Sequence, residues 1–358
     1  MRPMRWPPGA RRATGETDPP RSVPGGNGVG GHDVGRRLLA GLASIALLAA
    51  CAAGASPTPT TFGPVTVVTG TSRCPGLDFA WTTDANGTKH VRDDYHADRC
   101  TLTTDDPRVS GSRSSTWNMD LWGRLGINHT IVQWGTQRLE NDGGAWEGRA
   151  TGVATMPSSP GDIIVHWYRG TGGYAGLSYF ELWTGFEAWK IRGQIFPGDP
   201  PPPYAEDAMG TERPVDGGPV ADQAVARVTG TATCPGQSMP WTTDPDGTQH
   251  VRDGEFRCTV TTDEPRVSGT EVAPRNMDLW GTIDDGAGVQ WGTSRLENDG
   301  GAWEGTGSGV WSSDRGDIIA FWYKGTGGYA GLSYFELWTG HDPWKIQGQI
   351  FPGDPPTP

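Results

Sequence analysis

The sequence lacks the long apolar runs and the helical periodicity that mark membrane-spanning and α-helical proteins. Its apolar run at residues 38–48 is too short to cross a bilayer as a helix. Within the repeated part of the chain, no stretch of about twelve residues combines a 3.6-residue apolar period with freedom from Gly and Pro. The sequence therefore does not predict a bundle of amphipathic or transmembrane helices.

Positive charge is also scarce. Lys and Arg number 29 against 41 Asp and Glu, which gives a net charge of −12. Residues 1–50 carry seven of the Arg against three acidic residues, so a chain without this segment has a net charge of −16. Such an acidic chain offers no electrostatic surface for nucleic acid and no polybasic face for a membrane.

Motifs of catalysis and metal binding are missing as well. The chain has no Gly-x-Ser-x-Gly motif, no phosphate-binding loop and no nucleophile–base pair that recurs along it. It also has no Cys-x-x-Cys or paired His of the kind that binds zinc. We therefore expect no metal ion, no cofactor and no catalytic residue.

Glycine, proline and tryptophan are abundant instead, with 55, 30 and 17 residues. Gly and Pro mark turns, whereas a disordered chain would be poor in aromatic residues. Apolar stretches between such turns, at residues 162–169, 177–184 and 189–196, are typical of β-strands. About eight such strands in roughly 130 residues predict a β-sandwich or a β-barrel.

This pattern of turns and short strands occurs twice along the chain. Residues 170–185 read GTGGYAGLSYFELWTG, and residues 325–340 are identical. Other motifs recur in the same order, including RLENDGGAWEG from Arg138 and again from Arg295. The sequence therefore predicts a duplicated domain.

The N-terminal region has the features of an export signal. Arg36 and Arg37 precede the apolar run, and small residues lead from it to Cys51. Leu-Ala-Ala-Cys resembles the lipobox of bacterial lipoproteins, which implies a diacylated Cys51 anchored to the outer face of the cell membrane. The alternative is an ordinary signal peptide with an incidental Cys. Residues 1–33 lack an apolar core, and we interpret them as an over-extended translation start, with Val34 as the candidate initiation site.

The other four Cys recur as one pair per repeat. An even number, matched spacing and an oxidising compartment predict the disulfides Cys74–Cys100 and Cys234–Cys258. The predicted divisions of the chain are a signal region at 1–50, a lipidated tether at 51–64, repeats at 65–199 and 225–354, a Pro-rich linker at 200–224 and a tail at 355–358.

The later part of each repeat resembles the allene oxide cyclase-like and dirigent-like barrel superfamily. The resemblance rests on a Trp-Glu-Gly strand, an apolar strand ending in Gly-Thr-Gly-Gly-Tyr-Ala-Gly-Leu, and a closing Ile-x-Gly-Gln-Ile strand. It implies an all-β fold of two tandem small antiparallel β-barrels with about eight strands each, to which the Cys pairs add one disulfide per repeat. The catalytic residues of allene oxide cyclases have no matching motif here, and the disulfide-bearing first half departs from that family.

The strand after the glycine-rich bend presents the candidate ligand pocket. Tyr179, Glu181 and Trp183 alternate onto one of its faces. If that face lines the barrel, the carboxylate is buried, with a raised pKa unless an Arg pairs with it. The alternatives are a solvent-facing Glu and a structural Glu–Arg pair. The full set of candidates is Tyr179, Glu181, Trp183 and Arg138 in the first repeat and Tyr334, Glu336, Trp338 and Arg295 in the second.

Other repeated polar motifs are predicted to be structural. Asp84 and Asp244 begin sequences that resemble calcium loops but lack the downstream glutamate ligand, which favours Asx turns. His90 and His250 recur without a neighbouring ligand residue, which indicates a structural role.

We expect a lipoprotein, tethered to the membrane through Cys51, that presents two barrels for binding or as part of the cell envelope. Its candidate ligands are a small apolar molecule and a glycan. Most Trp are expected in the core, with Tyr174 and Tyr329 as exposed aromatic residues. The alternative function is an isomerase or cyclase that acts on a small apolar molecule inside each barrel.

Overall fold

The structure is a computed structural model that describes residues 60–62, 64–75, 79–124, 128–155, 161–185, 188–201, 225–235, 237 and 239–356. The predicted signal region, Cys51, most of the tether and residues 202–224 of the linker lie outside the described residues. Among the described residues, no helix has the length and apolar character needed to span a membrane.

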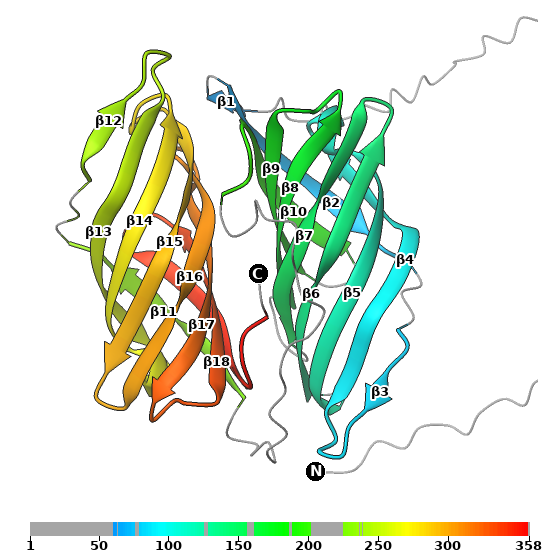
Figure 1. Cartoon of the computed structure of the whole chain (residues 1–358), viewed down its shortest axis with the longest axis vertical. Coiled ribbons are helices and arrows are strands. Elements are labelled where there is room, and N and C mark those ends of the chain that lie inside the picture. Colours follow the sequence, from blue (N-terminus) through cyan, green and yellow to red (C-terminus); the bar gives the residue numbers. More distant parts are fainter. Residues whose placement is uncertain are drawn as a thin grey trace, which may run out of the picture. The chain divides into compact units, whose positions relative to one another are not determined.

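The first repeat forms an antiparallel sheet that closes into an eight-stranded barrel (Figure 1). Successive strands pair from β4 to β10, and β2 then pairs with both β10 and β4. The barrel strands are β2 Val65–Arg73, β4 Lys89–Thr104, β5 Gly111–Arg124, β6 Asn128–Asn141, β7 Gly144–Thr155, β8 Asp162–Gly172, β9 Leu177–Gly185 and β10 Ala188–Pro197.

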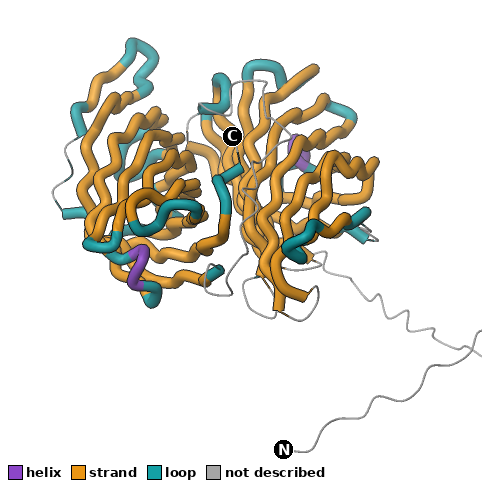
Figure 2. The backbone as a smooth tube through the Cα atoms, turned by 60° about the horizontal axis from the view of Figure 1, so that its bottom comes forward, coloured by secondary structure: helices purple, strands orange, loops and turns teal. Residues whose placement is uncertain are grey.

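The second repeat forms the same barrel, closed by the pairing of β11 with both β19 and β13. Its strands are β11 Ala226–Thr233, β13 Gln249–Thr262, β14 Gly269–Trp280, β15 Ala287–Asn298, β16 Gly301–Ser312, β17 Gly316–Gly327, β18 Leu332–Gly340 and β19 Trp344–Pro352. Figure 2 shows that strand dominates both repeats, with short 3-10 turns at Pro107–Val109 and Pro265–Val267. The predicted all-β fold of two small antiparallel barrels is confirmed.

Three short strands extend these sheets. β3 (Thr82–Thr83) pairs with β4, and β12 (Trp241–Thr243) pairs with β13. β1 (Thr60–Phe62) pairs with β2, so the end of the predicted tether belongs to the first sheet.

The two predicted disulfides are confirmed, and each lies at the seam that closes a barrel. Cys74 follows β2 and bonds to Cys100 of β4, beside the β2–β4 pairing. Cys234 follows β11 and bonds to Cys258 of β13, beside the β11–β13 pairing. Because these pairings involve only a few residues, the covalent bond holds the weakest part of each barrel wall together.

Apolar side chains occupy both faces of the barrel walls. On β9, Tyr179 and Trp183 point into the first barrel, whereas Phe180 and Leu182 point out of it. Most Trp are buried, as predicted, some inside a barrel, such as Trp146 and Trp183, and others on its outer face, such as Trp134 and Trp167.

The outward-facing apolar residues of both barrels belong to one buried cluster. The ring of Phe196 stacks at 6.0 Å on Trp280, and the equivalent Phe351 stacks at 6.2 Å on Trp122. Equivalent residues of the two repeats therefore make equivalent contacts, which explains why both faces of these strands are apolar in the sequence.

Candidate functional site

The identical sixteen-residue segment closes one end of each barrel. Tyr174 stacks on Trp146, with ring centroids 5.0 Å apart, and its Oη donates a hydrogen bond of 2.5 Å to Asn141 Oδ1. Trp146 Nε1 donates in turn to the carbonyl of Arg108, at 2.7 Å. The second barrel repeats these contacts through Tyr329, Trp303, Asn298 and Arg266.

This closure explains the glycines around the bend. A Cβ on Gly143 would lie 2.3 Å from Tyr174 Oη, and one on Gly170 would lie 2.1 Å from the Tyr174 carbonyl oxygen. Tyr174 and Tyr329 are each only 8% exposed, so the prediction that they are exposed aromatic residues is wrong. Their rings pack against Trp instead of facing solvent.

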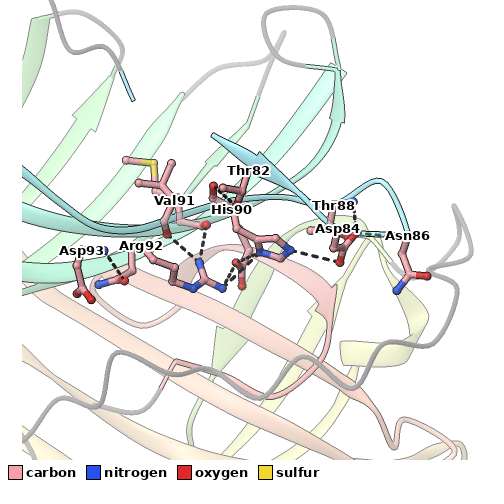
Figure 3. A network of polar contacts seen from close by, with 11 residues as sticks. Thr82, Asp84, Asn86, Thr88, His90, Val91, Arg92 and Asp93 are labelled. Atoms are coloured by element: carbon pink, nitrogen blue, oxygen red, sulfur yellow. Dashed lines mark hydrogen bonds and ion pairs between the residues drawn. The ribbon is translucent and has the colours of Figure 1, made fainter. Parts of the chain in front are cut away.

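A second repeated feature is a polar network on the outside of the barrel (Figure 3). In the first repeat, His90 Nδ1 lies 2.7 Å from Asp120 Oδ1, and His90 Nε2 lies 3.3 Å from Asp84 Oδ2. Arg92 Nη2 also contacts Asp120 Oδ1, at 2.6 Å. Asp84 Oδ1 accepts from the backbone N–H groups of Asn86 and Thr88, which confirms the predicted Asx turn.

The second repeat contains the same network. His250 lies 2.6 Å from Asp278 and 3.1 Å from Asp244, and its hydrogen bond to Asp278 raises its pKa. Both His thus contact carboxylates from a neighbouring strand and from the turn, which agrees with the structural role predicted for them. No group of three or more His, Cys, Asp or Glu among the described residues is arranged to hold a metal ion.

Inside the first barrel, Glu181 is fully buried, and both of its carboxylate oxygens accept hydrogen bonds. Tyr168 Oη and Tyr179 Oη each donate to a Glu181 carboxylate oxygen at 3.0 Å, and Arg113 Nη1 donates to Oε1 at 3.3 Å. The Arg113 guanidinium lies 3.6 Å above the ring of Trp183. The solvent-facing alternative for this Glu is thus wrong, and the structure shows a buried Glu–Arg pair.

The ionisation of this cluster follows from its burial. Burial raises the pKa of Glu181, and Arg113 and the hydrogen-bond donors offset part of that rise. Burial, followed by the nearby Arg113 cation, holds the pKa of His166 well below its ordinary value. His166 is therefore neutral, and the cluster balances one carboxylate against one guanidinium.

Arg138 and Arg295, the partners expected for these glutamates, lie elsewhere. Arg138 is on the exposed face of β6, where it pairs with Glu147 and Glu140. Arg295 pairs in the same way with Glu304 and Glu297. The wrong expectation has a simple cause, because Arg138 and Arg113 are on different strands and only the closed barrel brings Arg113 across to β9.

The second barrel holds the equivalent Glu336 in different surroundings. Arg113 is the third residue of β5, and the third residue of β14 is Glu271. The cation lies four residues further along, at Arg275, where the first repeat has the buried Trp117. Glu271 Oε1 accepts from Ser294 Oγ at 2.6 Å and from Tyr323 Oη at 3.3 Å, and it lies 4.0 Å from Arg275 Nη2.

Two buried carboxyl groups thus share one guanidinium. Burial raises the pKa of Glu336 to about 8, and the nearby Glu271 carboxylate adds to the rise. Burial also raises the pKa of Glu271, with Arg275 offsetting part of the effect. We conclude that Glu336 is protonated at neutral pH, whereas Glu271 carries the charge that faces Arg275.

A cavity of about 410 Å³ opens in the second barrel, at the end opposite to the one that Tyr329 closes. Its rim includes the exposed residues Ile283, Asp284, His341 and Asp342 from the β14–β15 and β18–β19 loops. Its deeper wall contains the rings of Phe256, Trp311, Trp338 and Trp344, together with Met277 and Ile319. This volume is within the range of small-molecule sites, and the walls combine aromatic and aliphatic side chains with polar and charged ones.

Two buried ionisable groups line this cavity, Arg275 and Asp317. Asp317 Oδ2 accepts from Trp344 Nε1 at 2.5 Å, and its Oδ1 accepts from Gln290 Nε2. Burial raises the pKa of Asp317, and these two donors offset part of the rise. Asp317 is therefore held by protein donors.

Only some of the site residues predicted from the sequence line this cavity. Trp338 lines it, whereas Glu336 and Tyr334 are buried but are not among its lining residues, and Arg295 is exposed. The sequence reasoning missed Arg275, Glu271 and Asp317. One signal for the first two was available, since Glu271 and Arg275 are charged residues that stand at the positions of Arg113 and Trp117, just before the shared Asn-Met-Asp-Leu-Trp sequence.

Comparison of the chain with models of protein families, with curated proteins and with solved structures finds no match.

Proposed function

We propose that this protein is an exported lipoprotein in which the first barrel is a filled structural module and the second barrel binds a small molecule. The observation that carries the binding role is the cavity of about 410 Å³ with aromatic walls in the second barrel. Two disulfides and the Leu-Ala-Ala-Cys sequence support export and anchoring through Cys51.

The first barrel differs at the positions that shape this cavity. Trp117 fills the place of Arg275, and the ion pair of Glu181 with Arg113 is complete within the protein. A buried carboxylate that accepts directly from Arg113, beside a large ring, supports a packing role for the described interior of the first barrel.

Binding is favoured over the alternative of an isomerase or cyclase. An acid catalyst must reach the atom to which it transfers a proton. Glu336, the buried acid with a pKa of about 8, and Glu271 are not among the residues that line the cavity. Asp317, the buried acid that does line the cavity, already accepts hydrogen bonds from Trp344 and Gln290, which favours a structural role for it over acid catalysis.

The binding role is tested by filling the cavity. A library of small amphipathic molecules is screened by thermal shift against the full chain and against Ile319→Phe, which places a larger side chain on the cavity wall. The matched control is Ile164→Phe, at the equivalent buried position of the first barrel. We expect ligands that stabilise the wild type and the control but not Ile319→Phe. Ligands that stabilise all three proteins equally would place binding outside this cavity.

Anchoring is tested separately by expressing the chain with a radiolabelled fatty acid in a bacterial host. We expect label in the wild type and none in Cys51→Ala, with the variant released from the membrane fraction. A labelled Cys51→Ala variant, or an unlabelled wild type, would refute the lipoprotein proposal.

A further inference from the structure

The ligand's chemical class can be inferred from the buried cation in the cavity wall; this inference rests on the proposed binding function. Arg275 is only 2% exposed and is the only Arg or Lys among the described residues that line the cavity. A guanidinium so far from water needs acceptors close by, because an unpaired buried charge costs several kcal/mol.

The protein supplies only part of what Arg275 requires. Neither Nε nor Nη1 of Arg275 has a hydrogen-bond partner among the described residues. Its nearest carboxylate contact is Glu271 Oε1, 4.0 Å from Nη2, which is beyond hydrogen-bond distance. In the first barrel, by contrast, Arg113 donates directly to Glu181. The N–H groups of Arg275 are therefore available to an acceptor that enters the cavity.

The charges around Arg275 favour a single negative charge on that acceptor. Glu271 already offsets much of the guanidinium charge, and Asp284 and Asp342 are located on the rim. A phosphate dianion would meet more negative than positive charge on this path, whereas a carboxylate brings one charge to two N–H groups.

The other residues of the cavity wall indicate the size and the apolar character of the rest of the ligand. The ring centroids of Phe256 and Trp338 lie 5.6 and 5.9 Å from Arg275 Cζ, so the cation is bordered by flat apolar surfaces. Met277 and Ile319 add aliphatic wall. The cavity volume of about 410 Å³ corresponds to roughly fourteen water molecules at about 30 Å³ each. This space suits a small apolar body directly attached to the charged group.

We propose that the cavity of the second barrel binds a small amphipathic monocarboxylate, whose carboxylate pairs with Arg275 and whose apolar body packs against Phe256 and Trp338.

The test is titration calorimetry of the full chain in detergent with matched probes. The carboxylates are 2-naphthoate and decanoate, the neutral counterparts are 2-naphthamide and decanamide, and the dianion is 2-naphthyl phosphate. We expect the carboxylates to bind at least about tenfold more tightly than the amides, because a hydrogen bond to a charged group contributes about 1.5–3 kcal/mol. We expect the phosphate to bind more weakly than 2-naphthoate.

Two variants change the head-group interaction in opposite directions. Arg275→Met should weaken carboxylate binding by about 10- to 100-fold and leave amide binding within a factor of about two. Glu271→Gln removes the competing carboxylate and should strengthen carboxylate binding. The control is Arg257→Met, because Arg257 is an exposed residue of the same barrel with its side chain 62% accessible.

Folding of each variant is checked by thermal unfolding, and Arg275→Lys, which keeps the charge, replaces Arg275→Met if the latter does not fold. Carboxylate selectivity that survives Arg275→Met overturns the assignment of Arg275, as does selectivity that survives Arg275→Lys with no change in affinity. Equal binding of amides and carboxylates overturns the monocarboxylate inference but leaves the binding function in place. Failure of every library compound and every probe to bind would overturn both.

Discussion

The two barrels share an identical strand but place its glutamate in opposite electrostatic surroundings. Glu181 faces Arg113 and two tyrosine hydroxyls, and its cluster is neutral with every charge paired. Glu336 lies near a second carboxylate, Glu271, and keeps its proton up to a pKa of about 8. Identity of sequence over one strand therefore does not mean identity of chemistry.

The difference comes from β5 and β14, the strands that lie across the barrel. A carboxylate replaces Arg113, and the cation moves four residues along the strand to Arg275. This move takes the charge away from the closed end and places it in the wall of a cavity. The buried guanidinium of the first barrel thus donates directly to a carboxylate, whereas that of the second lies 4.0 Å from Glu271 Oε1 and lines a cavity.

The strongest test of this comparison is the same substitution in both barrels. Glu181→Gln leaves the buried Arg113 without a counter-charge and should cost about 3–5 kcal/mol at pH 7. Glu336→Gln replaces a protonated acid with an amide of similar shape and should change stability by no more than about 1 kcal/mol. Hydrogen exchange measured by mass spectrometry reports each barrel separately. Equal losses in the two barrels would contradict the assigned charge states.

Removal of a disulfide should affect the two barrels alike. The bonded residues are 26 apart in the first repeat and 24 apart in the second. Cys100→Ser and Cys258→Ser should each cost about 3 kcal/mol, because loops of nearly equal length lose the same restraint in the unfolded state. Chemical denaturation of each variant measures the loss. A much larger effect in one barrel would show that its closing seam depends on the bond more strongly.

The pH dependence should separate the barrels again. Folded Glu336 keeps its proton up to a pKa of about 8, whereas an unfolded Glu releases it near 4.5. The contribution of Glu336 to the stability of the second barrel should therefore be largest below about pH 4.5 and be lost as the pH rises to about 8. In the first barrel, burial raises the pKa of Asp162 to about 6, so the stability that Asp162 contributes is lost over a lower pH range, from about pH 3.8 to 6. Denaturation across pH 4–9 should show that Glu336→Gln flattens only the upper range, with Asp162→Asn as the converse control.

The smallest expected effect concerns the closed ends. Tyr174→Phe and Tyr329→Phe each remove one hydrogen bond to an Asn side chain and keep the ring stacked on Trp. Each should cost about 1 kcal/mol. Thermal unfolding of the two variants should give matching shifts, and unequal shifts would mean that the identical segments are not equally placed.

Much of the fold could be predicted from the sequence. The repeat, the turn residues and the short β-branched and aromatic stretches indicated two small β-barrels, and the Cys spacing indicated both disulfides. Less of the site could be predicted. Tyr179, Glu181 and Trp183 do share a face, but the outward face of the same strand is equally apolar, so alternation alone did not show which face is interior.

The sequence by itself determined the local properties of this protein, because strand alternation, turn chemistry and disulfide spacing depend on residues close together in the chain. Only the tertiary structure decided the partners of the buried charges. Arg113 and Glu181 are 68 residues apart and meet because the barrel closes and brings β5 opposite β9. The same closure in the second repeat leaves Arg275 without a full set of acceptors, and no local pattern encodes that result.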